Sequence, residues 1–137
     1  MKKVVFDADR VLVDWFSQIR NYSIENNLPH EHLDELLKEQ RFIKPSELFQ
    51  VDDVKAMLHF KKYNNSDLIR ELNYQQKEAI DHVRNISRNA ELIVLSCLGV
   101  DGVTQNQIKN RKENIIDLYG NVFSDFFIIN FGFLRCS

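Results

Sequence analysis

Two acidic residues separated by one position are the side chains of this sequence best suited to chemistry. Asp7 and Asp9 follow the short apolar run 4–6 within the segment FDADRVLVD. Alternate side chains of an extended chain point to the same side, so both carboxylates are expected to leave the end of one strand together. Such a pair can share a divalent cation, or divide the roles of nucleophile and acid/base. Two solvated acids after a strand would show the same spacing.

Apolar runs predict the elements that must position these carboxylates. Residues 4–6, 92–95 and 126–129 are typical of buried strands, whereas the spacing over 15–89 predicts several short helices. A further helix is expected from about Thr104 to Tyr119. The order strand, helices, strand, helix, strand predicts an α/β fold with a three-stranded parallel sheet and right-handed crossovers. Ligands of such sheets bind at the carboxyl ends of the strands.

The same segments resemble motifs of the haloacid dehalogenase (HAD) superfamily of hydrolases. The first motif of that family is an apolar strand followed by Asp-x-Asp and a short apolar tail, which Val11 and Leu12 match. The strand over 92–95, closed by Ser96, resembles the second motif. The chain is also similar to compact phage-type and nucleotidase-like members, in which an aromatic residue such as Trp15 follows the first motif. The resemblance covers essentially the whole chain.

This resemblance implies a division of the chain into a core and a cap. Residues 1–14 and 90–137 would form a HAD-like Rossmannoid α/β core, and residues 15–89 a helical cap inserted after the first strand. The implied activity is that of a magnesium-dependent phosphatase that acts on a small phosphorylated metabolite or a nucleotide. Substrate preference would reside in the cap.

The resemblance also implies a role for each site residue. Asp7 would attack phosphorus to form an aspartyl-phosphate, and Asp9 would protonate the leaving oxygen and then activate water. Ser96 would bind a phosphoryl oxygen, and Arg135, in the segment GFLR, would supply a phosphate-binding cation. Mg²⁺ would be bound by the carboxylate of Asp7 and the backbone carbonyl of Asp9. Arg10 stands where many members have glycine, and its guanidinium would either crowd the phosphate or help to bind it.

The sequence lacks the fourth motif of the family, an acidic pair on a later strand. We therefore interpret the chain as truncated at its C-terminus, with impaired catalysis. The first strand would then have an open edge, which predicts a homo-oligomer formed through that edge. The alternative interpretation is a catalytically inactive HAD-like remnant that serves as a binding or interaction module.

Composition and charge exclude some classes of binding partner and predict the cellular compartment. Eighteen basic and twenty acidic residues give a net charge of −2, so no broad positive field exists to attract a nucleic acid polymer or an anionic membrane. No apolar stretch approaches the roughly 18 residues of a membrane span, and the first residues lack a signal-peptide core. Two cysteines make neither a disulfide framework nor a zinc site. These features predict a cytoplasmic protein.

Two further polar residues have alternative interpretations. Asp14 is expected to cap the helix that begins at Trp15, although it could instead face the substrate. Arg111 lies on the helix after the second motif, where it could point towards the phosphate or into solvent. We expect Arg111 to be solvated.

Overall fold

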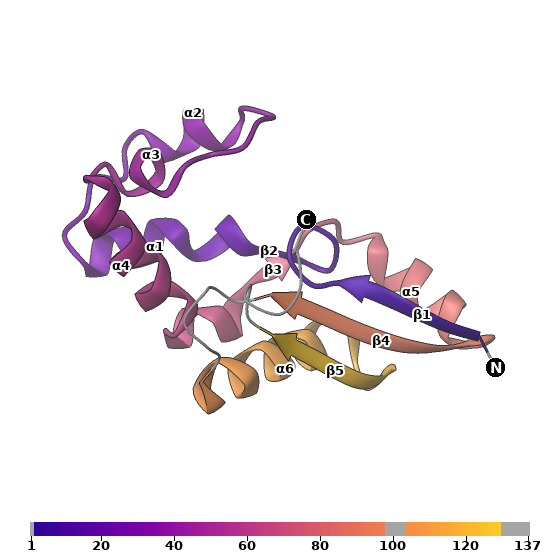
Figure 1. The fold of residues 1–137 in the computed structure, drawn as a ribbon. Coiled ribbons are helices and arrows are strands. Elements are labelled where there is room, and N and C mark those ends of the chain that lie inside the picture. The colour runs from indigo at the N-terminus through magenta and orange to yellow at the C-terminus, as the bar shows by residue number, and fades with distance from the viewer. Residues whose placement is uncertain (1, 98–103, 130–137) are drawn as a thin grey trace.

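The computed structural model describes residues 2–97 and 104–129, and has the α/β fold that the sequence predicts (Figure 1). In chain order, with η marking short 3-10 helices, the elements are β1 (Lys2–Asp7), β2 (Val13–Asp14), η1 (Trp15–Gln18), α1 (Ile19–Glu25), α2 (Leu33–Leu37), α3 (Pro45–Phe49), α4 (Asp53–Asn64), η2 (Asp67–Glu71), β3 (Asn73–Tyr74), α5 (Ala79–Ser87), β4 (Ala90–Cys97), α6 (Gln105–Tyr119) and β5 (Phe123–Ile129). No helix within the described ranges is both long and apolar enough to cross a membrane.

The main sheet has three parallel strands in the order β1-β4-β5. Leu95 of β4 pairs with Asp7 of β1 on one side and with Phe127 of β5 on the other, so the carboxyl ends of the strands meet at one edge. The strand β1 pairs with β4 alone among the described strands, and the side chain of Val5 is 57% exposed. The edge of the sheet at β1 is therefore open within the described residues.

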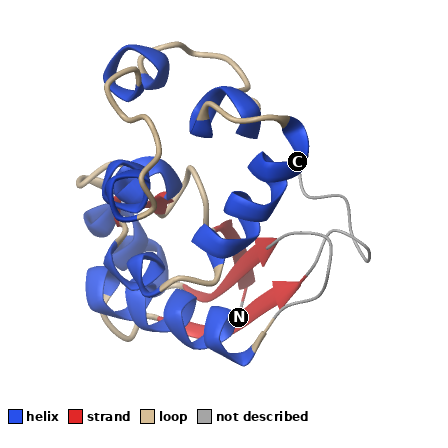
Figure 2. Ribbon diagram, turned by 90° about the vertical axis from the view of Figure 1, so that its left-hand side faces the viewer, coloured by secondary structure: helices blue, strands red, loops and turns tan. Residues whose placement is uncertain are grey.

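The helices form two groups around this sheet. Helix α5 contacts β4 and α6, and the buried Ile115 and Tyr119 of α6 belong to the same core cluster as Val94 and Phe123 of the strands. Helices α1 to α4 lie beyond the carboxyl ends of the strands, as Figures 1 and 2 show. The predicted cap falls mainly in this second group, and its boundaries stay a prediction.

The turn between β1 and β2 carries Asp9 and is held by backbone hydrogen bonds. The amides of Leu12 and Val13 donate to the Ala8 carbonyl at 3.0 Å each, and the Arg10 amide donates to the Val13 carbonyl at 2.9 Å. The Tyr119 hydroxyl of α6 donates to the Leu12 carbonyl at 2.6 Å. The strand thus ends at Asp7, and Asp9 lies in the turn instead of continuing the strand as expected.

Arg10 has a left-handed backbone with φ of 68°, a conformation that favours glycine. We expect Arg10→Gly to be more stable than Arg10→Ala by about 1 kcal/mol, because both lose the guanidinium but only glycine relieves the backbone. Both variants lose the same contact of the guanidinium with the Phe16 ring, whose centroid lies 5.9 Å from Arg10 Cζ. Urea unfolding of the two variants measures the difference, and equal stabilities would contradict a strained backbone at this position.

Candidate functional site

Asp7 ends β1 with an exposed side chain at the carboxyl edge of the sheet. Partial burial is the largest cause that raises the pKa of its carboxyl, and the negative charge of Asp9 raises it further. A hydrogen bond from the Ala8 amide opposes both effects. Electrostatically, Asp7 and Asp9 are therefore neighbours, as the Asp-x-Asp spacing predicts, although they lie on a strand end and a turn respectively.

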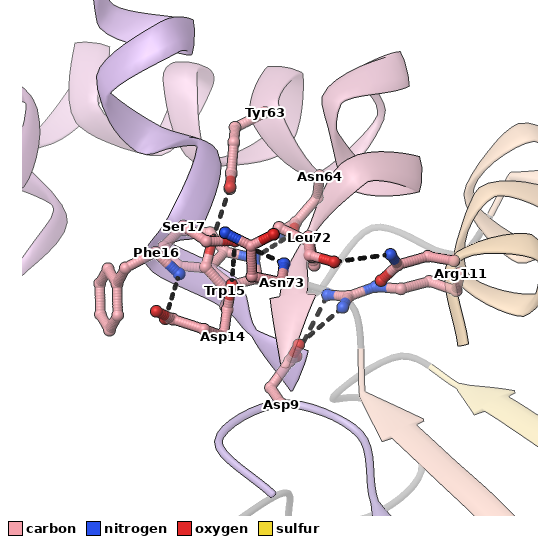
Figure 3. Close-up of polar contacts among 11 residues, drawn as sticks. Asp9, Asp14, Trp15, Phe16, Ser17, Tyr63, Asn64, Leu72, Asn73 and Arg111 are labelled. Atoms are coloured by element: carbon pink, nitrogen blue, oxygen red, sulfur yellow. Dashed lines mark hydrogen bonds and ion pairs between the residues drawn. The ribbon is translucent and has the colours of Figure 1, made fainter. Parts of the chain in front are cut away.

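The carboxylate of Asp9 is held by a buried arginine. Arg111 Nη1 donates to Asp9 Oδ1 at 2.6 Å and Arg111 Nη2 donates to Asp9 Oδ2 at 3.1 Å (Figure 3). The Arg111 side chain is 0% exposed, whereas that of Asp9 is 29% exposed. Paired hydrogen bonds of this kind fix the orientation of a carboxylate as well as its position. The expectation that Arg111 is solvated is wrong.

A buried polar stripe on α6 explains why Arg111 points inwards. Gln107, Asn110, Arg111 and Asn114 recur at helical spacing on one face, and all four are buried. Asn110 Nδ2 donates to the Ser66 carbonyl at 3.3 Å, and Asn114 Nδ2 donates to the carbonyls of Arg70 and Leu72 at 3.1 and 2.9 Å. The stripe thereby satisfies backbone carbonyls at both ends of η2. Arg111 Nε has no hydrogen-bond partner among the described residues.

The start of the helical segment is fixed next to Asp9. The amide of Phe16 donates to Asp14 Oδ1 at 3.0 Å, so Asp14 caps η1 and the expected capping role is confirmed. Trp15 Nε1 donates to Asn64 Oδ1 at 2.7 Å, and the Tyr63 hydroxyl donates to the Trp15 carbonyl at 2.6 Å (Figure 3). These bonds tie the end of α4 to the chain that leaves the Asp9 turn.

Ser96 lies one residue beyond the β4 partner of Asp7 and is 1% exposed. Alternation along β4 places its side chain on the face opposite that of Leu95, the residue that pairs with Asp7. Its hydroxyl has no hydrogen-bond partner among the described residues. An unpaired buried hydroxyl is uncommon in folded proteins. The phosphate-binding role of Ser96 stays a prediction, as does that of Arg135, which lies outside the described residues.

The oxygen atoms available near the end of β1 fit a weakly held magnesium ion. No group of three or more acidic, histidine or cysteine side chains that could hold a metal occurs within residues 2–97 and 104–129. The carboxylate of Asp9 is occupied by Arg111, which leaves the exposed carboxylate of Asp7 and the carbonyl of Asp9. Magnesium is commonly bound through one or two protein carboxylates, with water and substrate phosphate completing its shell.

Comparisons with known proteins give two likenesses. No protein-family model matches the chain. It is 29% identical over 122 residues to an uncharacterized 32.4 kDa protein from the gp30–rIII intergenic region of Enterobacteria phage T4, and this match covers 89% of the chain but only 42% of that protein. It is similar to the crystal structure of YfnB from Bacillus subtilis, described as a HAD-hydrolase bound to magnesium, with 15% identity, a TM-score of 0.49, and coverage of 93% of this chain and 63% of that chain.

Proposed function

We propose that this chain carries the nucleophile and the acid/base of a magnesium-dependent phosphomonoester hydrolase of the HAD type. The observation that carries the proposal is the exposed carboxylate of Asp7 at the end of a parallel strand, beside a second carboxylate whose orientation is fixed by the buried Arg111. The motif resemblance over residues 4–12 and 92–96 supports the same assignment. The chain spans less than half of its phage relative, so the activity of a longer protein is part of the proposal.

In the first step, an oxygen of Asp7 attacks phosphorus while the bond between phosphorus and the ester oxygen breaks. The leaving oxygen takes the proton that the substrate phosphate monoanion brings, relayed by Asp9, which is a carboxylate paired with Arg111 before and after the step. In the second step, Asp9 takes a proton from water as the water oxygen attacks the aspartyl-phosphate. The bond between phosphorus and Asp7 breaks, the released inorganic phosphate takes the proton from Asp9, and both side chains are again carboxylates. Positioned proton transfer of this kind contributes typically about 100- to 10,000-fold to the rate.

Arg111 acts in this scheme as a positioning residue for Asp9. Its two hydrogen bonds use one lone pair on each carboxylate oxygen and leave another on each for proton transfer. Because α6 buries the guanidinium completely, the orientation of the carboxylate does not depend on a mobile surface side chain. Magnesium bound by Asp7 and the Asp9 carbonyl would offset the repulsion between the carboxylate nucleophile and an anionic phosphate.

A phosphatase assay tests the proposal directly. The protein is expected to hydrolyse p-nitrophenyl phosphate and ribose 5-phosphate in the presence of Mg²⁺, to lose this activity in excess EDTA, and to regain it when Mg²⁺ is restored. Absence of turnover for every phosphomonoester at saturating Mg²⁺ would contradict hydrolysis by this chain. It would favour an interaction module, for which the edge of β1 offers a surface that no described strand covers.

The pKa of the Asp7 carboxyl is expected to lie above the ordinary value of an aspartate in the metal-free protein. Partial burial and the charge of Asp9 raise the pKa of Asp7 from its usual 3.8, so the protonated form persists to higher pH. A protonated carboxyl is not a nucleophile, and activity is therefore lost as the pH falls through the raised pKa. Mg²⁺ bound to Asp7 favours the carboxylate, so the direction of the pKa shift is checked by an NMR titration of the metal-free protein. An Asp7 pKa at or below 3.8 in that titration would contradict the described environment.

A further inference from the structure

A pocket of about 660 Å³ lies next to the Asp9 turn, and its size is typical of small-molecule sites. Its walls come from the turn and the start of the helical segment, from α2, from residues 39–42 and from Gln75. Arg10, the neighbour of Asp9, lines the pocket, whereas Asp7, Asp9 and Ser96 do not. The pocket therefore adjoins the candidate active site and is not the place where the proposed chemistry occurs.

Most charges in the pocket wall are already paired. Arg20 forms an ion pair with Asp34 at 2.5 Å, and Arg41 forms ion pairs with Glu39 and Glu47 at 2.7 and 2.8 Å. Arg10 has no ion pair with a described residue, and its guanidinium lies over the ring of Phe16. Arg10 and Asp14, whose carboxylate accepts a hydrogen bond from the Phe16 amide, are thus the two charged groups of the pocket wall without an ion pair to a described residue, and Arg10 adjoins Asp9 in the chain.

The remaining lining combines aromatic rings with free amide groups. Phe16 and Phe42 both line the pocket, and Phe42 is 73% exposed, which leaves its ring open to a ligand. Exposed rings of this kind stack well on the flat face of a nucleobase. Gln40 and Gln75 also line the pocket, and the side-chain amide of neither forms a hydrogen bond with a described residue. An amide offers both a donor and an acceptor, as the edge of a nucleobase requires.

We propose that this pocket binds the nucleoside part of a nucleoside monophosphate, with the phosphate directed past Arg10 towards Asp7. The proposal rests on the proposed phosphatase function and names its substrate class. Phe42 stacks on the base, Gln40 and Gln75 pair with its edge, and Arg10 attracts the phosphate. A sugar phosphate without a base would leave the aromatic ring and the amides without partners.

Matched substrates and variants test this assignment. The wild-type protein is expected to hydrolyse nucleoside 5′-monophosphates with kcat/KM at least about tenfold above that for ribose 5-phosphate. Phe42→Ala is expected to raise KM for the nucleotide roughly ten- to hundredfold, the usual effect of losing one stacked ring, and to leave ribose 5-phosphate unchanged. Phe127→Ala is the control, because Phe127 is a half-exposed ring on β5 that does not line the pocket.

A binding measurement separates the pocket from the chemistry. Calorimetry on Asp7→Asn, with and without Phe42→Ala, measures the affinity for a nucleoside monophosphate and for ribose 5-phosphate without turnover. Nucleotide affinity that depends on Phe42 supports the pocket even if every hydrolysis assay is negative, and in that case only the phosphatase proposal fails. Equal affinity for the two ligands, or an equal effect of Phe42→Ala on both, overturns the pocket assignment whether or not the protein is a phosphatase.

Discussion

Replacing Asp7 by asparagine is expected to lower kcat for phosphomonoester hydrolysis by roughly a thousandfold or more, because the amide cannot form the covalent intermediate. The stability of the variant is expected to be unchanged or higher. The raised pKa of Asp7 means that its charge is unfavourable in the folded protein, and the substitution removes this charge. Steady-state kinetics and thermal unfolding of the same preparation measure the two effects.

Asp117→Asn provides a matched control for Asp7→Asn. Asp117 is an exposed residue on α6, so its replacement makes the same chemical change away from the carboxyl edge of the sheet. The control is expected to retain wild-type activity. Activity that survives Asp7→Asn, or is lost equally in both variants, would exclude Asp7 as the nucleophile.

Asp9→Asn is expected to destabilise the protein by about 3 kcal/mol, because it leaves the completely buried guanidinium of Arg111 without an anionic partner. Arg111→Met is expected to cost less, about 1–2 kcal/mol, since methionine is unbranched and apolar, and water can reach the partly exposed carboxylate that remains. The double variant is expected to be no less stable than Arg111→Met alone. Urea unfolding of the four proteins gives the coupling energy of the pair.

The ion pair between Arg20 and Asp34 is the control for this cycle. Its N···O distance of 2.5 Å is shorter than that of the buried pair, but the two side chains are 42% and 76% exposed. Exposed ion pairs couple by about 0–1 kcal/mol, so Arg20→Met and Asp34→Asn are expected to be nearly additive. Equal coupling energies for the two pairs would mean that burial of Arg111 does not determine its effect on Asp9.

The strands and the longest helix could be predicted because their signals are local. The three apolar runs each fall within a strand, and the expected helix over 104–119 matches α6. Thr104 caps that helix through a reciprocal pair with Gln107. Asp14 likewise caps η1 through a contact two residues away. Each of these features depends on neighbours in the sequence.

The burial of Arg111 could not be predicted from its neighbours in the sequence. Its stripe of amide and guanidinium side chains has the spacing of a helix face, and a polar face usually meets solvent. Here that face meets the irregular segment around η2, whose backbone carbonyls need donors, so it is buried. The burial of this face is seen only in the contact between α6 and a segment some 40 residues earlier in the chain. One local feature of the sequence did indicate that this face is buried: none of the four positions of the stripe carries lysine or glutamate.

The position of Asp9 depends on the turn in a similar way. Strand alternation predicts a carboxylate parallel to that of Asp7, but hydrogen bonds to the Ala8 carbonyl end the strand and bring Asp9 towards α6. The backbone conformation of Arg10, the next residue of this turn, could not be predicted from its residue type. The residue is an arginine, yet its backbone has the left-handed conformation that glycine favours.

Detection of a phosphorylated Asp7 is the most direct test of the central claim. The wild-type protein is mixed with a phosphomonoester and Mg²⁺ and quenched in acid within a single turnover. Peptide mass spectrometry is expected to show a phosphate group on Asp7, and none in Asp7→Asn. Substrate hydrolysis without any modification of Asp7, or with the phosphate on another residue, would contradict the account.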